Sequence, residues 1–288
     1  MKRKWIRWVS WILLTPIILF VILMVLLYVP PVQNLLRREV TAYASKATGM
    51  QIQVERIDLR FPLNLLVRGV EVIQQPDTLL SLESLNVRVQ AWPLIKGKVE
   101  VDEVTLSRVA VNSADLMEGM KIKGVLGRFF LQSHGVDLSN ELAVINQVEL
   151  SDTHMQLLMN DTTTTPKDTT ASAPINWKVA LHQLKLKNVS FSMQLPADSM
   201  RMTAHIGEAA INNAQADLKN QYYDLKKFLL SGTSASYDTG TAQPTEGFDA
   251  SHIAVRDIRI ALDSLLYKGR DMNLSLIHIS EPTRHSLI

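Results

Sequence analysis

One spacing of four apolar residues recurs along most of the chain. An alternating apolar pair is followed by two polar residues and then by a second alternating apolar pair. The period of two within each half predicts a β-strand with one apolar and one polar face. The extra central residue shifts the alternation by one, so a bulge or a break is needed to keep both halves on one face. The copies are Ile52, Val54, Ile57, Leu59; Leu80, Leu82, Leu85, Val87; Val99, Val101, Val104, Leu106; Ala143, Ile145, Val148, Leu150; Val179, Leu181, Leu184, Leu186; Ala204, Ile206, Ala209, Ile211; and Ile253, Val255, Ile258, Ile260.

The pattern predicts a mostly β fold with consecutive strands joined by turns such as Gln75–Asp77. No long amphipathic helix follows that would cover the apolar side of these strands. We therefore expect an antiparallel β-meander curled into an elongated apolar trough. A closed β-sandwich buries the same residues and is the alternative.

An uncharged apolar stretch, 8–30, precedes the strands and is long enough to span about 30 Å of hydrocarbon as a helix. The preceding segment, 1–7, is basic and is expected in the cytoplasm by the positive-inside rule, which places the body of the chain in the periplasm. No small-residue cleavage site follows, which favours an uncleaved, single-pass anchor in a bacterial inner membrane. The residues that set this orientation are Lys2, Arg3, Lys4, Trp5, Arg7, Trp8 and Trp11.

The residues 31–49 predict a short amphipathic connector helix that caps the first strand. Apolar residues recur at helical spacing, and Gly49 is a plausible stop. These apolar positions are Val32, Leu35, Leu36, Val40, Tyr43 and Ala47.

Two polar stretches interrupt the strand pattern and are expected to be exposed loops. The first, 160–174, is of low complexity, and the second, 231–251, is rich in Ser, Thr, Gly and Asp. The first stretch divides the body into two trough segments, 50–159 and 175–273.

Composition and charge exclude several classes of function. The chain is 47% hydrophobic and 20% charged, with a net charge of +2, and lacks cysteine. The four bases of the N-terminal segment account for the positive excess, so the body offers no basic surface for nucleic acid. Histidines are scattered singly and no catalytic motif occurs. We therefore expect no catalytic residues, no metal site, no cofactor and no enzymatic activity.

The order of elements resembles the N-terminal region of the AsmA-like and TamB (translocation and assembly module) proteins, in their Bacteroidetes form. The resemblance covers about Met1 to Asn112 and is diffuse afterwards. It rests on a basic start, an apolar helix ending in VPPVQ, an amphipathic LLRREVTAYASKATG, and the strand segments IQVERIDLRFPLNLLVRGVEV and DTLLSLESLNVRVQ. It implies an inner-membrane protein whose β-trough extends into the periplasm, with roles in phospholipid transport and in outer-membrane protein assembly.

The C-terminal residues 274–288 are interpreted as an adapter-derived tail. The segment LSLIHISEPTR, from Leu274 to Arg284, resembles the translation of a transposase-based sequencing adapter. We therefore expect native sequence to stop near Asn273 and to continue in a longer protein.

The expected function is a phospholipid conduit between the inner and outer membranes. The inner membrane and phospholipid are the expected partners, with an outer-membrane barrel protein at the missing C-terminal end. A platform for assembly or translocation of outer-membrane proteins, or a non-catalytic periplasmic scaffold, is the alternative. The predicted groove lining consists of Ile52, Val54, Ile57, Leu59, Leu80, Leu82, Leu85, Val87, Val99, Val101, Val104 and Leu106.

Overall fold

A computed structural model describes most of the body of the chain. The described residues are 28–95, 100–113, 119–137, 141–159, 176–240, 251–269 and 271–276. The elements are α2 (Pro30–Thr48), β1 (Gln51–Arg60), β2 (Asn64–Gln74), β3 (Asp77–Val89), α3 (Ala91–Ile95), β4 (Val101–Asn112), β5 (Met120–Asp137), β6 (Leu142–Met159), β7 (Lys178–Leu195), the 3₁₀ helix η1 (Pro196–Asp198), β8 (Met200–Asp217), β9 (Tyr222–Thr239), β10 (His252–Lys268) and β11 (Asp271–Leu276).

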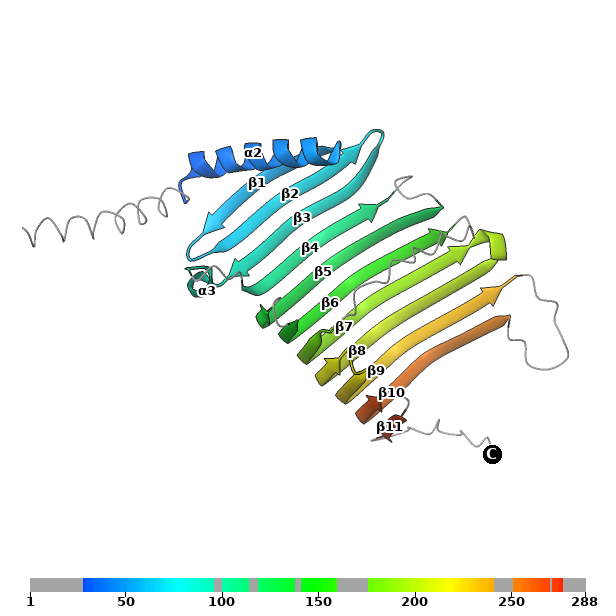
Figure 1. Ribbon diagram of the computed structural model, residues 1–288. Coiled ribbons are helices and arrows are strands. Elements are labelled where there is room, and N and C mark those ends of the chain that lie inside the picture. The colour runs from blue at the N-terminus through cyan, green and yellow to red at the C-terminus, as the bar shows by residue number, and fades with distance from the viewer. Residues whose placement is uncertain are drawn as a thin grey trace, which may run out of the picture.

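All strands belong to one open sheet. Its eleven strands lie in sequence order from β1 to β11, and each strand pairs with its neighbours in the chain (Figure 1). Within the described residues no second sheet faces this one, so the closed sandwich is not the architecture. The two predicted trough segments, 50–159 and 175–273, form one continuous layer through the pairing of β6 with β7.

The expectation of a wholly antiparallel meander is wrong at one step, because β6 and β7 are parallel. Two parallel strands require a connection that returns along the length of the first strand. The intervening residues 160–177 are as numerous as the 18 residues of β6, which is enough chain for that return. The low-complexity segment 160–174 lies outside the described residues, and its length is what permits the parallel step.

The second predicted loop, 231–251, is also partly wrong. Strand β9 continues to Thr239, and the described chain resumes at Ser251. Ser234 and Ser236 lie on one face of this strand, while Ala235 and Tyr237 pair with Ala204 and Met202 on the other. The composition of residues 231–251 is typical of a loop because the segment contains few apolar residues.

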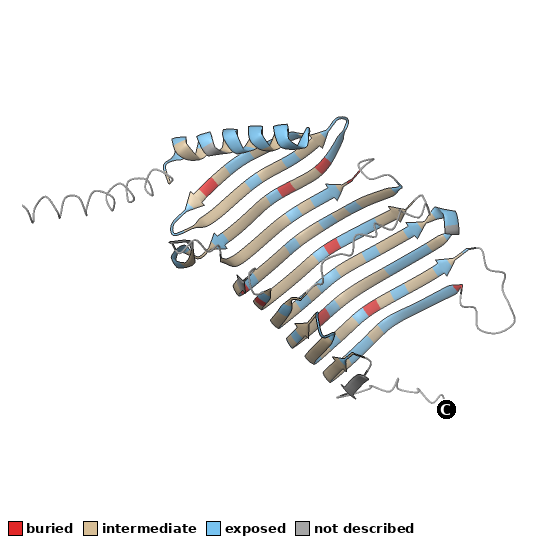
Figure 2. Cartoon of the chain, in the orientation of Figure 1, coloured by how far each residue is buried: buried red, intermediate tan, exposed pale blue. Residues whose placement is uncertain are grey.

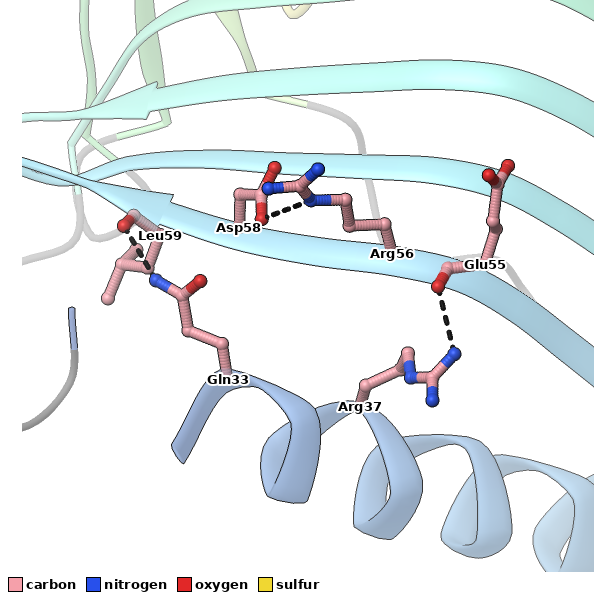
Figure 3. A network of polar contacts seen from close by, with 6 residues as sticks. All are labelled: Gln33, Arg37, Glu55, Arg56, Asp58 and Leu59. Atoms are coloured by element: carbon pink, nitrogen blue, oxygen red, sulfur yellow. Dashed lines mark hydrogen bonds and ion pairs between the residues drawn. The ribbon is translucent and has the colours of Figure 1, made fainter. Parts of the chain in front are cut away.

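The helix α2 covers the outer edge of β1. A free edge strand exposes unpaired backbone groups that invite association with other strands. Gln33 Nε2 donates to the carbonyl of Leu59 at 2.9 Å, and Arg37 Nη1 donates to the carbonyl of Glu55 at 2.9 Å (Figure 3). Near the other end of β1, the amide of Ile52 donates to Ser45 Oγ at 3.1 Å. Side chains of the helix therefore take the place of a neighbouring strand.

The side of α2 that faces β1 is polar, which explains an unusual orientation. Gln33, Arg37, Thr41 and Ser45 follow one another at four-residue spacing and are partly buried. The helix packs against backbone donors and acceptors rather than against an apolar core, so its polar side is the complementary one. The apolar side chains of Leu35, Val40 and Tyr43 are consequently exposed.

The predicted membrane anchor falls almost entirely outside the described residues. Of the segment 8–30, the structure describes residues 28–30. Among the described residues, no helix combines the length and the apolar character needed to cross a bilayer. The orienting residues of the basic segment 1–7, with Trp8 and Trp11, also lie outside the described part.

The last described strand enters the segment that resembles an adapter. Leu274 pairs with Leu265 and Leu276 pairs with Leu262, so β11 continues past Asn273. Residues 277–288 lie outside the described part of the chain.

Replacement of Arg37 by alanine tests the role of α2 as an edge cap. Arg37→Ala removes the donor to the carbonyls of Val54 and Glu55. We expect amide hydrogens of β1 to exchange about tenfold faster, as a loss of roughly 1–1.5 kcal/mol of local stability implies. Hydrogen-exchange mass spectrometry measures this. Arg38→Ala, an exposed neighbour on the same helix, is the control, and equal acceleration in both variants would contradict the role.

Candidate functional site

Apolar residues of adjacent strands are paired with one another across the whole sheet. A row begins at Leu59 on β1 and reaches Leu262 on β10 with an apolar residue at every position. Because directly opposed residues of paired strands lie on the same face, such rows form one surface. The first row is Leu59, Leu65, Val87, Val104, Leu131, Val148, Leu184, Ile211, Phe228 and Leu262. The second is Ile57, Val67, Leu85, Leu106, Phe129, Leu150, Leu186, Ala209, Leu230 and Ile260.

Two further rows lie nearer the other end of the strands. The third is Ile52, Val72, Leu80, Val111, Gly124, Met155, Phe191, Ala204, Ala235 and Val255. The fourth is Val54, Val70, Leu82, Val109, Leu126, Thr153, Val189 and Ile206. We call the surface made by these four rows the apolar face.

The opposite side of the sheet, the polar face, carries hydrophilic rows at the same register. Cross-strand ion pairs join Arg88 to Glu103 at 3.1 Å and Lys185 to Glu149 at 3.7 Å. One row of the polar face is Arg56, Arg68, Ser84, Ser107, Arg128, Ser151, Lys187, Glu208 and Ser231. The sheet is therefore amphipathic across its thickness, although apolar Val125, Phe130 and Leu229 also lie on the polar face.

The extra residue of the repeated spacing lies where strand pairing is interrupted. At one level of the sheet, the pairing register skips one residue on each strand from β1 to β9, and these residues lie next to one another. We call them, with Asp257 on β10, the central line: Glu55, Gly69, Glu83, Arg108, Gly127, Asp152, Asn188, Gly207, Gly232 and Asp257. All of these residues are polar or glycine. Each lies beside a polar residue of its own strand, so two consecutive positions without an apolar side chain interrupt the alternation. The alternation restarts beyond the central line with apolar residues on the same face. For the copies of the spacing that begin at Val99, Ala143 and Val179, the extra residue lies elsewhere, and the register skips Asp102, Asn146 and His182 instead.

The backbone along the central line adopts left-handed geometry on alternate strands of the first half of the sheet. Gly69, Arg108 and Asp152 have φ values of 59°, 46° and 50°. Asn and Asp tolerate this conformation better than most residues, and Gly adopts it freely. Side chains also bond along the line, since Asn188 Nδ2 donates to Asp152 Oδ1 at 2.8 Å.

Two threonines occupy positions of the apolar face beside the central line without leaving a hydroxyl unpaired. Thr153 is 6% exposed, and its hydroxyl donates to the carbonyl of Ser151 at 3.2 Å. Thr233 is 7% exposed and donates in the same way to Ser231 at 3.4 Å. Each hydrogen bond spans a residue with positive φ, Asp152 or Gly232. The threonine hydroxyls are thus satisfied within their own strands.

No protein layer covers the apolar face in the described structure. Among the described residues, four apolar side chains are buried, namely Leu79, Leu82, Ala143 and Ala209. Figure 2 shows the buried residues as isolated positions on the sheet rather than as a connected core. Members of the rows such as Phe191 (39% exposed) and Val255 (47%) remain open to solvent. Such an extended exposed apolar surface is typical of a binding site for another apolar body.

The structure places most of the predicted lining residues on this face. The predicted residues of β1 and β3, together with Val104 and Leu106 of β4, lie in the four rows, and Val101 pairs with Val89 next to them. Val99 lies outside the described residues. The sequence prediction missed the contribution of β2 and β5. The same spacing is present on β2 at Leu65, Val67, Val70 and Val72, and in part on β5 at Leu126, Phe129 and Leu131, and this signal could have revealed them.

Polar groups elsewhere show no metal cluster. In the described part of the chain, no three His, Asp or Glu side chains gather in a way that could hold a metal ion. Hydrogen bonds from Asn220 and the charge of Lys178 hold the pKa of Asp217 below its ordinary value, a pairing that belongs to the turn between β8 and β9.

No protein-family profile matches the chain, and no curated protein matches its sequence.

The close approach of strands at the central line can be tested at Gly127. A Cβ atom at this position would lie 2.7 Å from Asp152 Cβ and 2.9 Å from the Asp152 carbonyl oxygen. We expect Gly127→Ala to lower the free energy of unfolding by about 1–3 kcal/mol, because backbone atoms must move to admit the methyl group. Urea unfolding of the full chain in mild detergent, followed by circular dichroism, measures this.

Gly240→Ala is the matched control, since its nearest contact would be an ordinary 3.6 Å to Ser199 Cβ. That variant should remain within about 0.5 kcal/mol of the wild type. A Gly127→Ala chain as stable as this control would show that the strands do not approach closely along the central line.

Proposed function

We propose that this chain is a membrane-anchored β-trough protein of the bacterial cell envelope and that its apolar face carries the acyl chains of phospholipids. The observation that carries the proposal is the set of apolar rows that cross the sheet without a protein layer above them. A soluble domain buries such a face against a second layer. Here an apolar ligand takes the place of that layer.

The length of the sheet and the interruption of its strands support a groove for elongated molecules. Eleven strands at about 4.8 Å spacing extend for roughly 48 Å along the rows. Strands β5 to β9 are each 18 residues long, so a flat sheet would be wider than a lipid needs. Interruption along the central line provides a place for every strand to bend, and bending toward the apolar face forms a trough.

The energetics favour lipid over a specific polar ligand. Each buried methylene contributes about 0.8 kcal/mol, so two acyl chains are held without any hydrogen bond. Successive positions along a row, such as Leu85, Leu106 and Phe129, are chemically similar. A lipid therefore moves from strand to strand with small changes in free energy, while its headgroup stays in water at the rim.

The sequence supplies the cellular setting of the proposal. The uncharged segment 8–30 and the basic residues before it favour an inner-membrane anchor with the body of the chain in the periplasm. The AsmA-like and TamB resemblance implies the same arrangement and a longer native protein. We infer that the sheet extends away from the inner membrane toward an outer-membrane partner, and that no catalytic step, cofactor or nucleic acid is involved.

A second candidate function is a platform for assembly of outer-membrane proteins. In the described residues, β11 pairs only with β10 from Leu262 to Lys268, and no strand pairs with the outer edge of β10 from Ile253 to Ile260. An open edge of this kind binds extended peptides by strand addition. Crosslinks from this edge to nascent outer-membrane strands, without lipid on the apolar face, would favour this function.

Photo-crosslinking distinguishes a lipid-filled face from an empty one. A photoreactive amino acid at Val87 or Leu106 should yield phospholipid adducts in inner-membrane vesicles, because both side chains lie on the apolar face. The same probe at Ser84 or Ser107, on the polar face of the same strands, should yield several-fold fewer adducts. Mass spectrometry of the trapped species measures the difference. Equal yields on the two faces, or none on either, would overturn the proposal.

A further inference from the structure

The outward side of α2 carries exposed apolar residues, with Glu39 and Lys46 between them. Leu35, Val40 and Tyr43 are 57%, 49% and 77% exposed. They follow one another over two turns of the helix, whereas the residues facing β1 are polar. Among the described residues, no element packs over these apolar side chains of α2.

The hairpin between β1 and β2 presents a further exposed ring beside the start of α2. Phe61 is 85% exposed, and the Tyr28 ring contacts it edge-on with 6.5 Å between centroids. The Tyr28 hydroxyl donates to the carbonyl of Pro62 at 2.6 Å. The point at which the chain enters α2 is thus fixed to the hairpin tip.

The position of these groups in the chain indicates what covers them. Helix α2 begins at Pro30, where the uncharged stretch predicted to span the membrane ends. A helix that follows a membrane segment directly, with one apolar and one polar side, lies in the boundary between headgroups and acyl chains. Aromatic rings such as those of Tyr43 and Phe61 favour the same layer.

We propose that α2 lies flat on the outer leaflet of the inner membrane, with Leu35, Val40, Tyr43 and Phe61 inserted at the level of the headgroups. The inference rests on the proposed function, because it assumes the membrane anchor. It deepens that function by placing the β1 edge of the sheet against the bilayer. The rows of the apolar face, which begin on β1, then start at the membrane surface and lead away from it.

The flat orientation differs from an upright one in which the ends of the strands meet the membrane. Trp92 of α3 is 69% exposed and lies at the same end of the strands as Phe61, two strands further from α2 (Figure 1). An upright sheet inserts Trp92 and leaves Tyr43 in water. A flat α2 inserts Tyr43 and leaves Trp92 in water.

Spin labels on single cysteines test the orientation, since the native chain has no cysteine. The full chain is labelled at position 40, 43, 61 or 92 and reconstituted in vesicles of phosphatidylethanolamine and phosphatidylglycerol. Collision with oxygen reports contact with lipid, and collision with a water-soluble nickel chelate reports contact with water. Arg38→Cys, exposed on the flank of the same helix, is the matched control.

We expect the oxygen-to-nickel ratio at positions 40, 43 and 61 to exceed the ratio at 38 and 92 several-fold. Ratios at 40 and 43 equal to that at 38, in a chain that still floats with the vesicles, would overturn the flat orientation while the anchor stands. Insertion at 92 but not at 43 would establish the upright orientation instead. A chain that does not float with vesicles would overturn the anchor and this inference together.

Discussion

The structure depends on one constraint, the register of strand pairing on both sides of the central line. A β-strand presents successive side chains to opposite faces, so an uninterrupted strand with this spacing would turn half of its apolar residues toward the polar side. Interruption at residues such as Glu55 and Asp152 adds one hydrophilic position to each strand. Because every neighbour is interrupted at the same height, apolar residues remain opposite apolar residues over the whole sheet.

A sheet of this kind obtains its stability without a buried core. Hydrogen bonds between neighbouring strands and contacts between opposed side chains link each strand only to the next. The weak points of such a layer are its edges, and α2 protects the first of them with Gln33 and Arg37. In the proposed function an apolar ligand occupies the uncovered face, which would connect the stability of the protein to that function.

Much of the site could be predicted from local spacing, because the period of two is written directly into each strand. The apolar residues of β1 and β3 were found in this way, and so was the need for an interruption. The parallel pairing of β6 with β7 could not be predicted, since it depends on the length of a connection whose composition carries no strand signal. The orientation of α2 could not be predicted from the sequence either. Its apolar spacing indicates an amphipathic helix, but which side packs is decided by the edge of β1, not by the helix.

The central claim is that acyl chains cover the apolar face. Phe129 and Phe130 are adjacent on β5 and lie on opposite faces, since Phe129 is opposed to Leu106 and Phe130 to Thr105. Fluorine NMR of the full chain, with fluorophenylalanine at one or the other position, can be recorded with phospholipid that carries a spin label near the end of one acyl chain. The account predicts strong broadening of the signal at 129 and little change at 130. Equal broadening at both positions, or none at 129, would contradict it.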